Sequence, residues 1–489
     1  MIVFALCAYF ALLLLVSRWV ADYDNNDTFF CAGRSSYWGL VAFGMIGASI
    51  SGLTFIGVPG WVMTTDMTYL QMCIGFIFGY IFVAFVLLPL YYRMKLTSIY
   101  TYLDARFGKK GYKTGATFFI LSKLLSAAAK FYIVIRILQV CIADEYGIPY
   151  AATAALTLFF IWLYTHRSGM KSLVWTDAVQ TLFLIAALVL IMLRVCSMLE
   201  MNPSEALTAV MNDPHSRVFE WSDFVSRQNF WKQFLSGVFV VIVMTGLDQD
   251  MMQKNLTCRS LRGAQMNMCT YGVMFLPVNF LFLALGILLL MLYGKLGMEL
   301  PASGDELLSG IIFSGALGEA ALMFFTIGVV ASALSSADSA LTALTTSFCV
   351  DILDMEKFYS VDLKFTARKE LVRKRVHIFM MLLFLCLTLL FNEVGSSSVM
   401  DLIYTIVSYT YGPLLGLFAY GLLMNTTPKE TGVMYVAIAS PLVCLVLNYV
   451  CKHHYGYEFG YEMLMLNGLL TFVGLWMLPR KPMYSASEY

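Results

Sequence analysis

The sequence predicts an all-α integral membrane protein with about 13 transmembrane helices. Its 489 residues are 60% hydrophobic and only 13% charged, whereas soluble domains are about 25% charged. Apolar windows of about twenty residues, the length that a helix needs to cross the hydrocarbon core, recur along the whole chain. These two observations exclude an ordinary soluble protein.

The charge balance excludes nucleic acid as a partner. The 32 Lys and Arg residues nearly cancel the 31 Asp and Glu residues, which leaves a formal charge of +1 and no basic surface. We therefore expect the lipid bilayer as the main partner and no obligate protein partner. The 11 Cys residues lack the spacing of a zinc site or a redox dithiol, so we interpret them as small buried hydrophobic residues.

The apolar windows follow one another through short connections. They cover residues 1–20, 38–60, 69–92, 115–141, 149–165, 174–198, 232–252, 270–294, 317–349, 376–392, 398–424, 432–451 and 462–478. The first window resembles a signal peptide but is not followed by a small-residue cleavage site, so we expect a retained helix. The longest connections are too short to bury a core of their own, which predicts one membrane domain.

The distribution of Lys and Arg predicts the orientation. When the connections are assigned alternately to two sides, one side carries 23 of these residues and the other carries 6. The positive-inside rule then places the N-terminus outside and the C-terminus in the cytoplasm. Short connections throughout favour a bacterial inner membrane.

The second window is unusually rich in residues that weaken a helix or carry oxygen. They are Gly44, Gly47, Ser49, Ser51, Gly52, Thr54, Gly57 and Pro59. Close packing of a continuous helix through small residues would explain them. The functional alternative is a helix interrupted near residues 50–52, whose freed carbonyl oxygens bind a cation.

The seventh window contains a matching weak point. Gly246, Asp248, Gln249 and Asp250 directly follow an apolar run. Paired interruptions in corresponding segments indicate an inverted repeat with a binding site between its halves. Asp248 and Asp250 could instead be solvated acids at the cytoplasmic mouth, an interpretation that we favour for Asp250.

The ninth window carries the densest set of oxygen ligands. Ser332, Ser335, Ser336 and Ser339 share one helical stripe with Asp338 at its edge. Serines in membrane helices often bond back to the preceding turn, which would explain one or two of them. Hydroxyl, carbonyl and carboxylate oxygens are the ligands of hard cations, so the set favours Na⁺.

Four further charged positions lie inside windows and need partners. Asp177 begins the sixth window, and the fourth contains Lys123, Lys130 and Arg136. We expect Lys123 and Arg136 to reach the interfaces by extending along the helix. Lys130 is near the middle, so it either pairs with an acid such as Asp248 or Asp338 or holds an anionic group of a solute.

Several motifs in the right order resemble the sodium/solute symporter family, which includes bacterial sodium/proline, sodium/galactose and sodium/sialic acid symporters. The motifs are Phe30-Cys31-Ala32-Gly33-Arg34 with Trp38, Tyr102-Leu103-Asp104-Ala105-Arg106-Phe107-Gly108, Trp175-Thr176-Asp177-Ala178-Val179-Gln180, Gly246-Leu247-Asp248-Gln249 with Gln253, and Ser335-Ser336. The resemblance implies a leucine-transporter-type fold of two inverted five-helix repeats, 38–198 and 232–424. An extra helix, 1–20, would precede them and two helices, 432–478, would follow.

The resemblance also implies binding residues. The main sodium site would use the carbonyl groups of Gly47, Ile50 and Ser332 with the hydroxyl groups of Ser335 and Ser336. A second sodium site would use Asp177, Ser335, Ser339 and Asp338, where Asp338 departs from the serine expected at its position. The substrate pocket would contain Ser49, Ser51, Thr54, Lys130, Met244, Thr245, Asp248, Gln249 and Tyr404 or Ser408.

The leading functional hypothesis is a sodium-coupled symporter that imports a small organic solute by alternating access, and not an enzyme. Lys130 favours a carboxylated solute, either sialic-acid-like or another organic acid. The alternative is a neutral sugar or inositol, although Leu53, Thr54, Met244 and Thr245 depart from the residues of the sugar-transporting members. A membrane sensor is a further alternative but would need a signalling module. An intramembrane enzyme is disfavoured because the five His residues lie in loops or at window ends.

Overall fold

The computed structural model describes residues 2–20, 26–50, 52–166, 169–224, 226–355, 363–394, 399–457 and 459–482. The first ten helices are α1 (Ile2–Val20), α2 (Asn26–Cys31), α3 (Trp38–Ser49), α4 (Gly52–Thr65), α5 (Tyr69–Phe82), α6 (Leu88–Arg93), α7 (Thr101–Leu138), α8 (Tyr150–Thr165), α9 (Met170–Leu199) and α10 (Pro203–Asn212). The next nine are α11 (Phe230–Val241), α12 (Gln249–Leu256), α13 (Leu261–Leu296), α14 (Glu306–Phe313), α15 (Glu319–Ser347), α16 (Leu363–Val394), α17 (Val399–Leu423), α18 (Glu430–Tyr455) and α19 (Glu462–Met477).

The helices account for every apolar window expected from the sequence. Among the described residues, 9 helices are long and apolar enough to cross a membrane, and two bent pairs raise this number to 11. The helices α8 and α19 are shorter apolar helices of 16 residues each. The prediction of an all-α membrane protein is therefore confirmed.

Both predicted helix interruptions are present. The axes of the helices before and after residue 50 differ by 60°, and those of Phe230–Gly246 and Gln249–Leu256 differ by 65°. Helical geometry ends at Ile50 (φ −80°, ψ 85°) in the first pair and at Leu247 and Asp248 in the second. The alternative of a continuous second helix is wrong.

Close backbone contacts around the first broken pair depend on glycine. A Cβ on Gly60 would overlap the backbone of Gly304, and one on Gly286 would overlap the carbonyl oxygen of Pro59. The backbone of α4 therefore lies directly against α13 and against the residues that precede α14. Small residues let membrane helices approach in this way.

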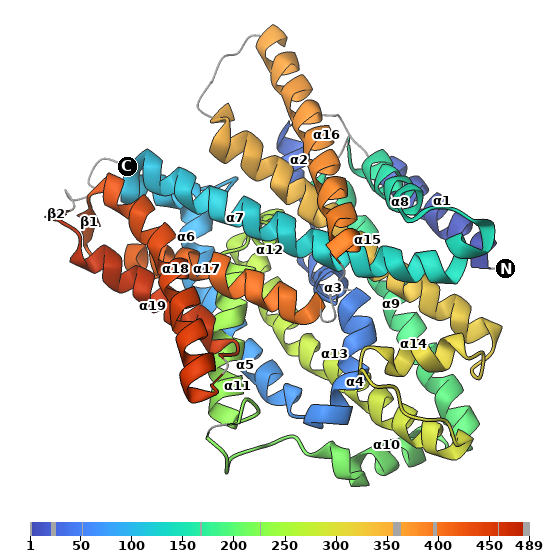
Figure 1. Ribbon diagram of the computed structural model, residues 1–489. Coiled ribbons are helices and arrows are strands. Elements are labelled where there is room, and N and C mark those ends of the chain that lie inside the picture. The colour runs from blue at the N-terminus through green and yellow to red at the C-terminus, as the bar shows by residue number, and fades with distance from the viewer. Residues whose placement is uncertain are drawn as a thin grey trace.

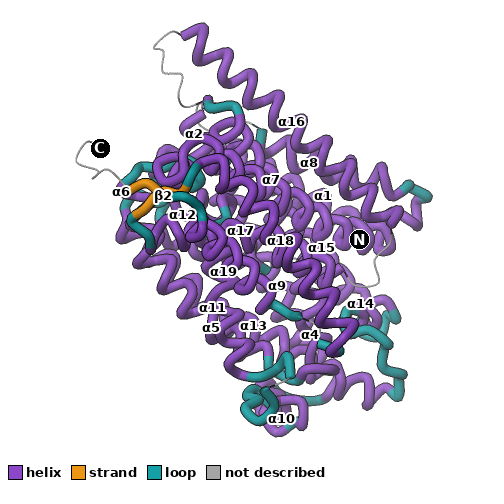
Figure 2. Tube along the Cα trace, turned by 60° about the vertical axis from the view of Figure 1, so that its left-hand side comes forward, coloured by secondary structure: helices purple, strands orange, loops and turns teal. Residues whose placement is uncertain are grey.

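The outer elements lie at opposite ends of the helical bundle. In Figures 1 and 2, α10 is at the lower end of the molecule and one end of α16 extends past the other helices at the upper end. A two-stranded antiparallel sheet, β1 (Thr426–Pro428) and β2 (Arg480–Pro482), pairs Thr427 with Lys481. The helix α1 packs against α8 and α9, while α17 packs against α7 and α19.

Candidate functional site

The first helix break meets α15 at its serine-rich stripe. The Ser336 hydroxyl donates to the Ala48 carbonyl oxygen over 3.3 Å, from α15 to the last turn of α3. The Ser332 hydroxyl is buried, lies 3.5 Å from the position of a Cβ on Gly52, and has no hydrogen-bond partner among the described residues. Because a buried polar atom without a partner is costly, this hydroxyl is a candidate ligand for a cation. The local oxygen atoms suit a hard cation.

Contacts between α3 and α9 bring Asp177 to the same region. A Cβ on Gly47 would overlap Thr181, and one on Gly44 would lie 3.0 Å from the Asp177 Cβ. The Ser335 hydroxyl donates to Asp177 Oδ1 over 2.6 Å. Since this hydroxyl uses its hydrogen on the carboxylate, its lone pairs remain available to a cation.

The other oxygen of Asp177 faces Lys254 of α12. Lys254 Nζ lies 2.8 Å from Asp177 Oδ2, close enough for an ion pair although not aligned as a hydrogen bond. Each of the two side chains is 2% exposed. Lys254 directly follows the seventh apolar window, 232–252, and is one of the 23 cations assigned to the inner side; that assignment is wrong for this residue, because α12 continues through it inside the helical bundle.

Asp338 belongs to the opposite edge of the same stripe. Its Oδ2 accepts a hydrogen bond of 2.7 Å from the Tyr164 hydroxyl of α8, and its Oδ1 accepts one of 3.3 Å from Ser339. No ion pair with a Lys or Arg residue is found for Asp338 among the described residues. It is thus not the partner of Lys130.

The second helix break holds a compact ionic cluster. Lys123 Nζ lies 2.7 Å from Asp250 Oδ2 and 3.1 Å from Asp248 Oδ2. Asp248 also caps α12 by accepting from the Asp250 backbone N–H at 2.8 Å, and it accepts from the Tyr411 hydroxyl of α17 at 2.6 Å. Two of our expectations are therefore wrong: Lys123 does not extend to the interface, and Asp250 is not a solvated acid.

A central cavity of about 180 Å³ lies between the two breaks. Of the substrate residues expected from the sequence, those that line it are Ser49, Thr54, Lys130, Met244, Thr245 and Asp248. Lys130 contributes an ammonium group from the interior of α7, and no carboxylate of the described residues lies within ion-pair distance of it. Lys123, Asp250 and Ser336 also line the cavity.

Two tyrosines that sequence reasoning missed form one wall of this cavity. The Ser49 and Tyr271 hydroxyls are hydrogen-bonded, and the Tyr80 hydroxyl donates to that of Tyr271 over 2.9 Å. These groups connect α3, α5 and α13 and present hydroxyl oxygens to the cavity. Only the position of each tyrosine inside an apolar window could have indicated this role.

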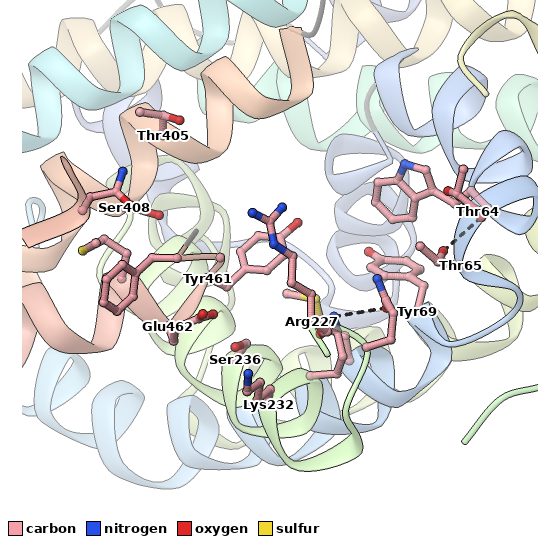
Figure 3. Close-up of a pocket in the computed structure, with 18 of the residues that line it drawn as sticks. Thr64, Thr65, Tyr69, Arg227, Lys232, Ser236, Thr405, Ser408, Tyr461 and Glu462 are labelled. Atoms are coloured by element: carbon pink, nitrogen blue, oxygen red, sulfur yellow. Dashed lines mark hydrogen bonds between the residues drawn. The ribbon is translucent and has the colours of Figure 1, made fainter. Parts of the chain in front are cut away.

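A larger vestibule of about 670 Å³ adjoins the central cavity and shares Tyr69, Met72 and Tyr461 with it. Figure 3 shows the Arg227 guanidinium group extending into the opening between Tyr461 and Tyr69. Among the described residues, the lining also contains Lys232, Lys452 and one carboxylate, that of Glu462. In the orientation predicted from the Lys and Arg distribution, every segment that lines the vestibule lies toward the outer side of the membrane.

Among the described residues, two of the expected substrate residues, Gln249 and Ser408, do not line the central cavity. Gln249 is buried, donates to the Thr97 carbonyl oxygen and accepts from the Ile99 backbone N–H, so it holds the segment before α7. Ser408 lines the vestibule instead. Ser51 lies outside the described residues, as does the side chain of Tyr404.

Two broken helices around a central polar cavity define a multi-pass membrane transporter with the leucine-transporter-type fold. The family model of the sodium:solute symporter family matches residues 29–439. The chain belongs to this family, which comprises transporters and not enzymes.

Known proteins that resemble the chain agree with this assignment. The sodium/sialic acid symporter SiaT of Proteus mirabilis is 24% identical over 454 residues, which are 91% of this chain and 88% of that protein. The human sodium/iodide cotransporter is 28% identical over 266 residues, which are 53% of this chain but 41% of that protein. The chain thus spans less than half of this relative.

Solved structures show the same fold. A substrate-bound, outward-open structure of a Na⁺-coupled sialic acid symporter superposes with a TM-score of 0.81, at 21% identity and with 99% of both chains covered. Mhp1, a nucleobase-cation-symport-1 family transporter, gives a TM-score of 0.56 at 14% identity, with 93% of this chain and 94% of that chain covered.

Proposed function

We propose that this protein imports a small anionic solute together with sodium by alternating access. The observation that carries the proposal is the position of Lys130. Its ammonium group lines the central cavity, while the two acids that could have paired with it make other contacts: Asp248 with Lys123 and Tyr411, and Asp338 with Tyr164. A cation in a membrane domain needs a matching anion, and here the solute supplies it.

The break between α3 and α4 supports sodium as the coupled ion. Gly47, Ile50, Ser332, Ser335 and Ser336 would surround the cation there. The contact of Ser336 with Ala48 joins the two sides of such a site, and the Ser332 hydroxyl, which has no partner among the described residues, would be available to the cation. A cation at this point would hold α3 against α15 and so stabilise the state that accepts solute.

The names of relatives support an anionic solute. They describe transport of iodide, of sialic acid and, in sodium-coupled monocarboxylate transporter 1 of Xenopus laevis, of monocarboxylates. All three are anions. The cavity of about 180 Å³ is smaller than the roughly 300–1,000 Å³ of common ligand pockets, so we propose a small organic or inorganic anion.

The chain would be organised as two repeats, residues 38–198 and 232–424, with residues 1–20 and 432–478 outside them. The two bent pairs, at 60° and 65°, occupy corresponding places in these repeats. We place the N-terminus outside a bacterial inner membrane and the C-terminus in the cytoplasm. The vestibule then opens to the exterior, and the ionic cluster of Lys123, Asp248 and Asp250 lines the central cavity.

The charges of sodium and the solute determine how much free energy the membrane potential and the sodium gradient supply for uptake. A sodium ion gains about 2.3 kcal/mol when it crosses a potential of ~100 mV, and a monoanion crossing with it loses the same amount. A tenfold sodium gradient adds about 1.4 kcal/mol, independent of the potential. The sodium gradient would therefore drive coupled uptake of a monoanion with one sodium ion.

A thermal-shift screen of the purified protein tests this function. Monocarboxylates, sialic acids, iodide, amino acids, sugars and inositols are compared with and without Na⁺, and positive compounds are then tested for uptake into proteoliposomes. We expect an anion to raise the melting temperature only when Na⁺ is present. Sodium-dependent stabilisation by a neutral sugar or inositol, with no response to any anion, would contradict the proposal.

A further inference from the structure

Lys254 pairs with Asp177, the carboxylate expected to bind a second sodium ion. Its Nζ atom lies 2.8 Å from Asp177 Oδ2, on the same carboxylate whose Oδ1 accepts from Ser335. Asp250 and Asp338 attract the same ammonium group from further away. Of the two carboxylates expected at the second site, that of Asp177 therefore already has a cation, supplied by the chain.

The surrounding contacts hold this lysine in place. Its neighbour Gln253 donates to the Phe30 carbonyl oxygen over 2.7 Å and to the Thr346 hydroxyl over 2.8 Å. The next residue, Asn255, accepts from Asn267 over 2.7 Å. With α12 fixed on both sides and the Lys254 side chain 2% exposed, the ammonium group has no solvated position nearby.

We infer that Lys254 acts as a built-in cation at the Asp177 site, so that the protein couples a single sodium ion to each solute molecule. Its charge neutralises Asp177, and a sodium ion beside it would meet a like charge in a poorly solvated place. This inference rests on the proposed function and makes uptake of a monoanion electroneutral. Asp177 and Lys254 then serve as positioning residues for Ser335.

Equilibrium binding of radioactive sodium to the purified protein, without solute, counts the ions directly. We expect one sodium per protein in the wild type and in Lys254→Arg. Lys254→Met removes the built-in cation and should raise the count to two, while Lys254→Met with Asp177→Asn should return it to one. Lys295→Met, at a largely exposed lysine, is the matched control and should leave one.

The outcomes distinguish the inference from the proposed function. Two ions in the wild type, or one ion in a folded Lys254→Met protein, would overturn the inference while leaving sodium coupling intact. No sodium binding at all would overturn both. If Lys254→Met fails to fold, two measurements on the wild type still test the inference. The wild type should bind one sodium ion per protein. Its accumulation of a monoanion should not change when the membrane potential is clamped at different values with valinomycin.

Discussion

The hydroxyl of Ser336 reaches the carbonyl oxygen of Ala48 across 3.3 Å, and this contact joins the middle of α15 to the broken end of α3. It is the most direct link between the two elements that the sequence singled out for sodium. In the leucine-transporter-type fold the two elements belong to different repeats. A cation that binds both elements would therefore stabilise one arrangement of the two repeats over the others.

Ser336→Ala should therefore raise the half-saturating sodium concentration. The loss of one oxygen ligand from a partly desolvated cation costs about 1–3 kcal/mol, or roughly 5-fold to 150-fold in affinity. Sodium titration of thermal stability or uptake measures the change. Thr326→Val, on the same helix but with its hydroxyl bonded back to the Leu322 carbonyl oxygen, is the control and should titrate like the wild type. An unaltered sodium response in Ser336→Ala would place the ion elsewhere.

Lys130→Gln should abolish binding of the anionic solute with little effect on folding, because no described carboxylate loses a partner. Lys130→Arg should retain part of the affinity. The exposed Arg136 of the same helix provides the control Arg136→Gln, which should bind solute normally. A large fall in melting temperature in Lys130→Gln that Asp248→Asn or Asp338→Asn reverses would mean that the lysine is paired within the protein.

Lys123→Gln should destabilise the protein strongly. Lys123 pairs with both Asp248 and Asp250, and its removal leaves two carboxylates at a poorly solvated site, at a cost of about 3–5 kcal/mol for a broken buried pair. Adding Asp250→Asn should restore part of the melting temperature. The absence of any rescue in this double variant would show that the cluster does not contribute as an ion pair.

Gly286→Ala should weaken the contact between α13 and α4, since the new methyl group overlaps the Pro59 carbonyl oxygen. Overpacking of this kind costs about 1–3 kcal/mol. Gly294→Ala, on the same helix with open space at the Cβ position, should be neutral or stabilising by up to about 1 kcal/mol through helix propensity. Equal melting temperatures for the two variants would contradict the close approach.

Composition and hydrophobic length by themselves determined the membrane class and the positions of the spanning segments, because the bilayer imposes both. The two helix breaks were also predictable, because glycine weakens a helix and polar side chains in an apolar window need partners within the protein. The interruptions near Ile50 and at Leu247 lie where the sequence placed them. The family motifs added the residues expected around each break.

Only the tertiary structure decided which charges meet. Lys123 and Asp248 are 125 residues apart in the chain, and Lys254 and Asp177 are also distant in sequence. No local spacing pairs them, because ion pairing depends on how helices from different parts of the chain pack. Tertiary packing alone determines that Lys130 lines the central cavity while Gln249 and Ser408 do not. It also determines that Lys254 lies against Asp177, the acid expected to bind sodium.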